Sequence, residues 1–387
     1  MTALEDAVSR TNEFYFLREF TFPAVTFAPT SRSELELADG IIWLDDLAVV
    51  FQMKERDGTA DRSKQARDKW FESKVIGRAT KQIRDTINYL HKHGPISATN
   101  NYGQTVLLSQ RQLKTLHKVV LFKEPATAEP PRRPKYHKSR TVGLVHLLPL
   151  DDYVGIVRSL LTLSEISEYL EWREMLNSSW PSEAEALPEQ SLVGHYLRGE
   201  KDAKPSLSDV VNLRVLQDDI DAWDMTGILT KFLERTMDDI GGIKYHLIIQ
   251  EVAKLHRGEL RLFKERFVAC MEAAKASEFR QPYRFTSPRT HCGFVFIPLQ
   301  SELREVRRTA LANLTAANKY DQRLDKCIGL SFVRDDDGWF TVDWCAHATK
   351  WEFDEEMESR LAKSYPFRPV KEQIVYRYPF KTDGGEI

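Results

Sequence analysis

The sequence has few cysteines, no long apolar run and no internal repeat. Only four of its 387 residues are cysteine, and all four lie in the last third of the chain. Four cysteines in a chain of this length do not make a disulfide framework. No apolar run approaches the roughly 20 residues of a membrane-spanning helix, and the first ten residues lack the basic start and apolar core of a secretory signal. We therefore expect a cytoplasmic protein without membrane segments.

The composition excludes a disordered chain and hides an uneven distribution of charge. Hydrophobic residues make up 42% and charged residues 29% of the sequence, so the chain can bury sizeable cores. Residues 52–140 contain 20 Lys and Arg but 8 Asp and Glu, whereas residues 151–240 contain 8 and 19. A basic segment inside a nearly neutral protein can be the docking surface for a polyanion, although a solvated charged face would have the same composition.

The pattern of apolar residues predicts an α/β protein of three parts. In the first 150 residues, β-branched and aromatic runs alternate with turn residues, and two segments have helical periodicity. The predicted strands cover residues 14–26, 36–42, 47–53, 119–122 and 142–148, and the predicted helices cover 1–12 and 66–92. Together they indicate a mixed sheet flanked by helices, with an exposed basic loop over 123–140.

The rest of the chain divides into a helical region and a second α/β region. Residues 151–278 read as mainly helical, with a proline-containing linker near 176–207. Residues 279–387 read as a C-terminal α/β domain whose role the sequence does not reveal. Its tryptophans and the aromatic tail around Tyr376, Tyr378 and Phe380 suit packing or a protein partner. Its cysteines and histidines, such as Cys345 and His347, lack the close paired spacing typical of zinc sites.

One hairpin in the basic part of the chain carries the residues with chemical potential. Asp39 lies near the start of one predicted strand, a turn follows, and the next strand is apolar until Gln52 and Lys54. Because side chains alternate along a strand, Gln52 and Lys54 share one face, and in a hairpin that face can lie beside Asp39.

These residue types suit metal-assisted hydrolysis of a phosphodiester. Magnesium, or manganese, prefers oxygen ligands, and here Asp39 offers a carboxylate and Gln52 an amide oxygen. A bound metal ion polarises the phosphate and lowers the pKa of a water molecule. Lys54 can orient that water and offset negative charge in the transition state.

The segment from Asp39 to Lys54 resembles the PD-(D/E)XK nuclease superfamily, and its Mrr-type restriction endonuclease branch in particular. The resemblance covers roughly residues 1–150. In that branch the helix after the lysine strand carries a glutamine and a tyrosine, which Gln82 and Tyr89 match. The resemblance implies a restriction-endonuclease-like fold, a metal-dependent endonuclease acting on DNA, with RNA not excluded, and a role in restriction or anti-phage defence.

The resemblance also implies a further acidic residue on the first helix or just before Asp39. Glu13, Glu34 and Glu36 are the candidates, and we expect Glu36, then Glu13, to complete the metal site. Gln52 stands where an acid is more common. The alternative is therefore a degenerate nuclease fold that binds nucleic acid or a protein without catalysis, or an interaction subunit whose acidic helices dock a larger protein.

Basic residues near the hairpin are the candidates for contact with phosphates. They lie on the helix predicted over 66–92 and in the basic loop. We expect contacts from Arg78, Lys81, Arg132, Arg133, Lys135, Lys138 and Arg140. For the loop, a merely solvated basic segment is an equal alternative.

Overall fold

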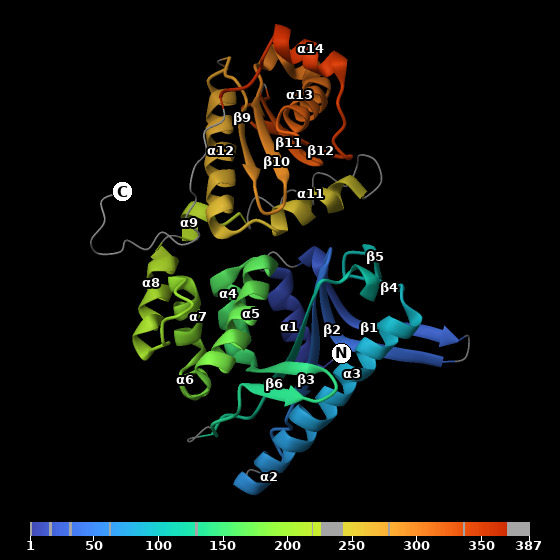
Figure 1. Cartoon of the computed structure of the whole chain (residues 1–387), viewed down its shortest axis with the longest axis vertical. Helices are drawn as coiled ribbons and strands as arrows, with labels where there is room; N and C mark the ends of the chain where they lie inside the picture. Colours follow the sequence, from blue (N-terminus) through green and yellow to red (C-terminus); the bar gives the residue numbers. More distant parts are fainter. Residues whose placement is uncertain are drawn as a thin grey trace. The chain divides into compact units, whose positions relative to one another are not determined.

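The computed structural model of the chain is shown in Figure 1. It describes residues 2–14, 18–30, 33–61, 63–127, 131–218, 220–225, 243–277, 279–335 and 337–369. The aromatic tail around Tyr376, Tyr378 and Phe380 lies outside the described residues. In the described part of the chain, no helix combines the length and the apolar character that crossing a membrane requires.

The chain forms two compact units, Met1–Gln217 and Asp218–Ile387. This division differs from the three predicted domains. The helices that follow residue 150 pack on the first sheet, and the last two helices before residue 278 pack on the second sheet. A helical layer covers a sheet in each unit, so the predicted helical region is split between them.

The N-terminal unit contains a mixed six-stranded sheet of the predicted α/β type, in the order β1-β2-β3-β6-β8-β7. Its strands are β1 (Thr21–Thr30), β2 (Ser33–Leu44), β3 (Leu47–Glu55), β6 (Thr115–Lys123), β7 (Tyr136–Ser139) and β8 (Gly143–Pro149). The central strands β3, β6 and β8 run parallel, and the outer pairs are antiparallel. Strand β7 lies within the predicted basic loop, so part of that segment is ordered by pairing with β8.

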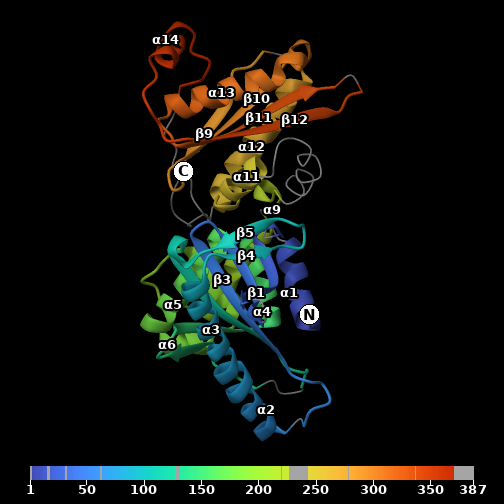
Figure 2. The same ribbon diagram turned by 90° about the vertical axis from the view of Figure 1, so that its right-hand side faces the viewer.

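Helices cover both faces of this sheet. One face carries α1 (Ala3–Phe14), α4 (Leu150–Leu160) and α5 (Leu163–Ser179), with α6 (Pro181–Ala186) and α7 (Glu189–Arg198) packed against α5. The other face carries one continuous helical rod made of α2 (Lys64–Trp70), η2 (Phe71–Arg78) and α3 (Ala79–His93), which extends past the sheet (Figure 2). Short elements complete the unit: η1 (Arg18–Phe20), β4 (Ile96–Thr99), β5 (Thr105–Leu108), η3 (Gln110–Gln112), η4 (Leu207–Val210) and α8 (Val211–Asp218).

The helical rod contains a π-helical segment, η2, between two α-helical segments. Its buried positions recur every four residues, at Phe71, Val75, Ala79 and Ile83, where they pack on β6 and β8. An α-helix turns once every 3.6 residues, so a strict spacing of four would drift around its surface. The wider π-helical turn keeps these side chains in line on the sheet. The rod was predicted as one helix over 66–92, and this is confirmed.

A buried polar network joins α5 and α7 to the sheet. The Arg173 guanidinium lies 2.7 Å from the Glu189 carboxylate, and both side chains are almost fully buried. Lys135 and the Tyr169 hydroxyl also donate to Glu189, and Arg173 donates to a backbone carbonyl of β8. Segment 176–207 was predicted as a linker, but it contains α6 and α7 and supplies the central acid of this network. Pro181 is the first residue of α6, a position where proline is tolerated, and Pro188 immediately precedes α7.

The C-terminal unit contains a four-stranded sheet in the order β12-β11-β10-β9. Helix α12 packs on one face, and α13 packs on the other. Gly329 permits the close approach of α13, because a Cβ atom there would overlap the Thr315 hydroxyl. The elements are α9 (Ile220–Trp223), α11 (Ile243–Ala253), α12 (Arg257–Lys275), β9 (Tyr283–Ser287), β10 (Cys292–Pro298), η5 (Ser301–Val306), α13 (Arg307–Asp321), β11 (Lys326–Arg334), β12 (Phe340–Ala348) and α14 (Glu355–Lys363).

We predict that Glu189→Gln destabilises the N-terminal unit by about 3–5 kcal/mol, because it leaves the buried Arg173 charge without its partner. Burial alone would raise the pKa of Glu189, but the charge of Arg173, with that of Lys135, lowers it to about 2. This stabilisation is therefore present above the ordinary pKa of 4.5 and is lost as the pH falls toward 2.

Urea unfolding at neutral pH measures this loss. The matched control is Glu183→Gln in the neighbouring helix α6, whose ion pair with Lys204 is solvent-accessible. We expect the control to unfold at nearly the wild-type urea concentration. Equal stability of the two variants would contradict the assignment of a stabilising role to the Arg173–Glu189 pair.

Candidate active site

The candidate site lies where β2 separates from β3. The two strands pair from the turn, Leu44 opposite Leu47, up to Gly40 opposite Phe51, and the pairing stops there. Beyond that point β2 continues beside β1, while β3 continues beside β6 as far as Glu55. We call this point the β2–β3 fork. Asp39 is the first residue of β2 beyond the last pair, so its carboxylate lies between the diverging strands.

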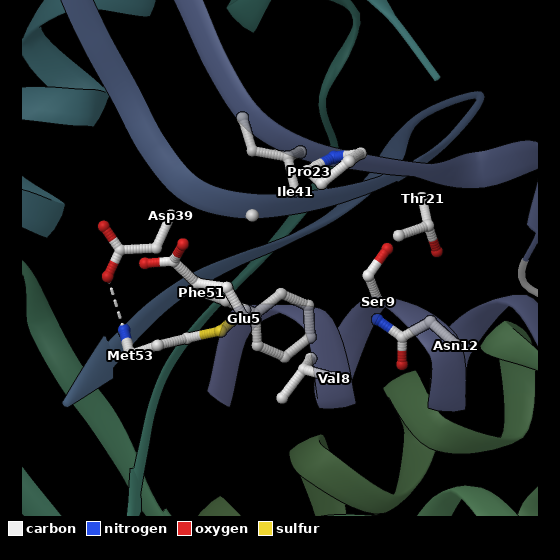
Figure 3. Close-up of a pocket in the computed structure, with 11 residues that line it drawn as sticks. Glu5, Val8, Ser9, Asn12, Thr21, Pro23, Asp39, Ile41, Phe51 and Met53 are labelled. Atoms are coloured by element: carbon white, nitrogen blue, oxygen red, sulfur yellow. Dashed lines mark hydrogen bonds between the residues drawn. The ribbon is translucent and has the colours of Figure 1, made fainter. Parts of the chain in front are cut away.

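The Asp39 carboxylate takes the place of the missing strand partner. Its Oδ2 atom accepts a hydrogen bond of 2.6 Å from the backbone N–H of Met53, as Figure 3 shows. The residue is only 6% exposed. A buried N–H group without an acceptor is costly, so this bond both ends the β2–β3 ladder and fixes the carboxylate.

Lys54 and Gln52 lie beside Asp39. The Lys54 ammonium is 3.1 Å from Asp39 Oδ2 and 3.5 Å from Gln52 Oε1, and it donates to the Met53 carbonyl at 2.8 Å. Gln52 is 2% exposed and the Lys54 side chain 13%. The convergence of these three side chains, predicted from the hairpin, is confirmed as geometry.

Two further carboxylates, those of Glu36 and Glu5, surround Asp39. Partial burial raises the pKa of Glu36, the charges of Asp39 and Glu5 raise it further, and Lys54 and Arg78 oppose the effect. Glu5, on α1, lines a small pocket together with Asp39 and Met53 (Figure 3). The Glu36 carboxylate therefore senses the charges of both Asp39 and Glu5.

Glu5 takes the position on the first helix where Glu13 was expected. The Glu13 carboxylate instead accepts hydrogen bonds from Ser9, from Asn101 and from the Tyr102 hydroxyl. One feature of the sequence favoured Glu5. It is adjacent to Leu4, which together with Val8 forms the apolar stripe of α1 that is buried in the structure. Which end of α1 meets the fork depends on tertiary packing. Glu34, the third candidate, is exposed and accepts a hydrogen bond from Thr26.

The donor atoms at the fork fit magnesium or manganese in their chemistry. Asp39, Glu36 and Glu5 supply carboxylate oxygens and Gln52 an amide oxygen, the hard ligands that these ions prefer. Among the described residues, however, no three His, Cys, Asp or Glu side chains converge closely enough to hold a metal ion. The Gln52 amide would be a further oxygen ligand, and the Glu36 side chain is exposed. Within the described residues, the cysteines therefore do not form a set of zinc ligands either.

The helical rod presents two of the expected residues toward the fork. Arg78 is exposed and lies close enough to lower the pKa of Glu36. Gln82 is half-buried, and within the described residues its Oε1 atom is buried without a hydrogen-bond partner. The expected tyrosine, Tyr89, packs on Phe27 of β1 instead of pointing to the fork.

Two of the expected phosphate-binding residues are held in ion pairs within the N-terminal unit. Arg133 contacts both Glu124 and Asp68 at 2.7 Å, and its side chain is 10% exposed. Lys135 is paired with the buried Glu189. Both cations neutralise internal carboxylates, so the structure differs from the prediction that they bind phosphate.

The remaining basic residues are exposed, but they lie in different places. Lys138 of β7 pairs with Leu144, near the start of β8. Lys54 of β3 pairs with Phe122 of β6, which in turn pairs with Pro149 at the end of β8. Lys138, and Arg140 after it, thus sit at the opposite end of the sheet from the fork, which differs from the prediction. Arg132 is exposed, and the exposed Lys81 pairs with Asp85.

We predict that the pKa of Glu36 reports on its neighbours at the fork. Asp39→Asn and Glu5→Gln should each lower the pKa of Glu36, because each removes a nearby negative charge. Arg78→Gln should raise it. The measurement is a ¹³C NMR titration of the side-chain carboxyl carbon of Glu36. Glu34→Gln is the control and should leave the titration of Glu36 unchanged. If neither Asp39→Asn nor Glu5→Gln changed the pKa of Glu36, these two carboxylates would not be its neighbours.

Comparisons of the chain with models of known families, with curated proteins and with solved structures found no match. The case for a function therefore rests on the residues at the β2–β3 fork.

Proposed function

We propose that the protein is a metal-dependent nuclease that hydrolyses phosphodiester bonds in DNA, with RNA as a further substrate class. One observation carries this proposal: Asp39, Gln52 and Lys54 converge at the β2–β3 fork, with Glu36 and Glu5 beside them. This arrangement supports the resemblance to the PD-(D/E)XK nucleases, in which an acid and a lysine on neighbouring strands share one site.

In this proposal the acids hold a magnesium or manganese ion. Asp39 offers Oδ1, the carboxylate oxygen that does not accept from the Met53 N–H group, and Gln52 offers its amide oxygen. Glu36 and Glu5 supply the remaining negative charge. When bound, the ion polarises the scissile phosphate and lowers the pKa of a water molecule. The charges of Asp39 and Glu5 raise the pKa of Glu36, and a bound divalent ion would relieve this repulsion of the Glu36 carboxylate.

Lys54 acts on the attacking water and on the phosphate. Its ammonium is fixed by the Asp39 carboxylate and the Met53 carbonyl, so it is oriented before the substrate arrives. One of its three N–H groups can orient the water, and its positive charge offsets the charge that develops on the phosphate. Pre-orientation matters because the donor then needs little reorganisation during the reaction.

A non-catalytic binding module is the second candidate, and one observation favours it. Asp39 already forms an ion pair with Lys54, and Gln52 is neutral, so the fork is satisfied electrostatically without a metal ion. In such a module the Lys54–Asp39 pair would be purely structural. Metal binding and cleavage separate the two candidates.

The cellular setting and partners are proposed on weaker grounds. None of the four cysteines forms a disulfide, which suits the reducing cytoplasm. A role in restriction or anti-phage defence rests on analogy with the nuclease family. In the C-terminal unit, the exposed side chains of Phe279, Trp339 and Phe353 support contact with a protein partner.

We predict that Lys54→Ala reduces cleavage by about 10²–10³-fold, because it removes a pre-oriented charge from the transition state. Metal binding should persist, since the ammonium is not a ligand. Asp39→Asn should lose cleavage and weaken metal binding together, while its side-chain oxygen still accepts from the Met53 N–H group. The assays are cleavage of plasmid, single-stranded DNA and RNA with magnesium or manganese, and Mn²⁺ binding by electron paramagnetic resonance.

The matched control is Lys123→Ala, at the end of the neighbouring strand β6, where the lysine forms an exposed ion pair with Glu55. We expect wild-type cleavage from it. Cleavage that survives both site variants would locate the chemistry elsewhere. A wild-type protein that binds nucleic acid but neither binds Mn²⁺ nor cleaves would favour the binding module.

We predict further that Glu5→Gln weakens Mn²⁺ binding, whereas Glu13→Gln on the same helix does not. Glu5 lines the pocket beside Asp39, whereas Glu13 is held by Ser9 and Asn101. The two substitutions remove the same charge eight residues apart on α1, so they separate a local from a general electrostatic effect. Equal weakening by both would mean that α1 contributes only long-range charge.

A further inference from the structure

A row of polar side chains runs along one flank of the helical rod. The row consists of the residues directly before three buried positions that pack on the sheet, Val75, Ala79 and Ile83. These residues are Lys74, Arg78 and Gln82. They share the spacing of four that the π-helical segment gives to the buried line. Residues one turn apart on a helix have Cβ atoms about 5–6 Å apart. The three side chains therefore form one straight column.

This flank faces the fork. Arg78 lies close enough to Glu36 to affect its pKa, and about two turns further on the Thr86 hydroxyl donates to the Leu37 carbonyl of β2. Helix α3 thus lies against β2 beside Asp39. In the order Gln82, Arg78, Lys74, the column runs toward α2, the end of the rod that extends past the sheet (Figure 2).

Two other exposed lysines of the rod, Lys69 and Lys81, lie on a different side. Lys69 and Lys81 each follow a buried residue by two positions, which places them about half a turn away, on the side opposite the sheet. Lys81 is also engaged by Asp85. On the flank that includes Gln82, Lys74 and Arg78 supply exposed positive charge.

We propose that Lys74 and Arg78 bind consecutive phosphates of one nucleic-acid strand and lead that strand to the β2–β3 fork, where the Gln82 amide meets it. The inference rests on the proposed nuclease function and adds the path of the substrate. The guanidinium of Arg78 can form two parallel hydrogen bonds to a phosphate, and Lys74 supplies a point charge one turn away. At the fork end of the column, the amide nitrogen of the half-buried Gln82 can donate to the strand.

Because the contacts are to the backbone, DNA and RNA share the chemistry that is recognised. Each phosphate contact releases counterions and adds about one to the slope of log affinity against log salt concentration. The column therefore predicts a specific reduction of that slope when one of its charges is removed.

The test is binding by the full chain without metal ions, so that it does not depend on cleavage. Fluorescein-labelled duplex DNA, single-stranded DNA and RNA of the same sequence are titrated at several salt concentrations and followed by anisotropy. The variants are Lys74→Gln and Arg78→Gln, with Lys69→Gln as the matched control on the opposite side of the rod. Thermal unfolding confirms that all three variants fold.

We expect Lys74→Gln and Arg78→Gln each to weaken binding several-fold and to lower the salt slope by about one, while Lys69→Gln changes neither. Equal effects of all three would show only diffuse attraction and overturn the proposed path. Absence of binding by the wild type would also overturn it. Both proposals are supported if Lys54→Ala abolishes cleavage and if DNA binding and its salt slope depend on Lys74 and Arg78. If the wild type binds through these residues but does not cleave, the substrate path stands and the nuclease function is rejected.

Discussion

The bond between the Asp39 carboxylate and the Met53 N–H group is the interaction on which the candidate site depends. A sheet can diverge only where the freed backbone groups find other partners. Here one carboxylate oxygen accepts the freed N–H group and also contacts Lys54. The same atom thus ends a strand pairing, opens a gap between two strands and holds an ammonium group within it. Structure and chemistry at the fork cannot be altered separately at this residue.

Much of the fork could be predicted from the sequence, because it depends on local rules. Asp45 and Asp46 form a two-residue turn, and Asp45 adopts a positive φ of 55°, which aspartate tolerates. That turn fixes the register of the hairpin, and alternation along the strands then puts Asp39 and Gln52 on one face. The length of the helical rod followed in the same way from apolar periodicity.

What the sequence could not predict depends on contacts between distant segments. Arg133 looks like a solvated cation in the sequence, yet its partner Asp68 is 65 residues away. Glu5 and Glu13 are equivalent in pattern, and only the placement of α1 on the sheet distinguishes them. The prolines at 181 and 188 indicated a linker, but Pro181 begins α6, Pro188 immediately precedes α7, and both helices pack against α5. In each case, tertiary packing decides between two locally equivalent interpretations.

The buried Arg173–Glu189 pair also limits how this fold can be recombined with others. The residues at the fork all precede residue 94, and the sheet itself ends at Pro149. Yet the Arg173 side chain comes from helix α5, beyond that end, and forms a hydrogen bond with the ring of His146, which is buried in the sheet. A gene fusion that carried only the sheet to a new chain would expose an uncovered face with buried histidines and apolar strands. The smallest piece that keeps this face of the sheet covered is therefore the sheet with its helical layer, within the compact unit that ends at residue 217.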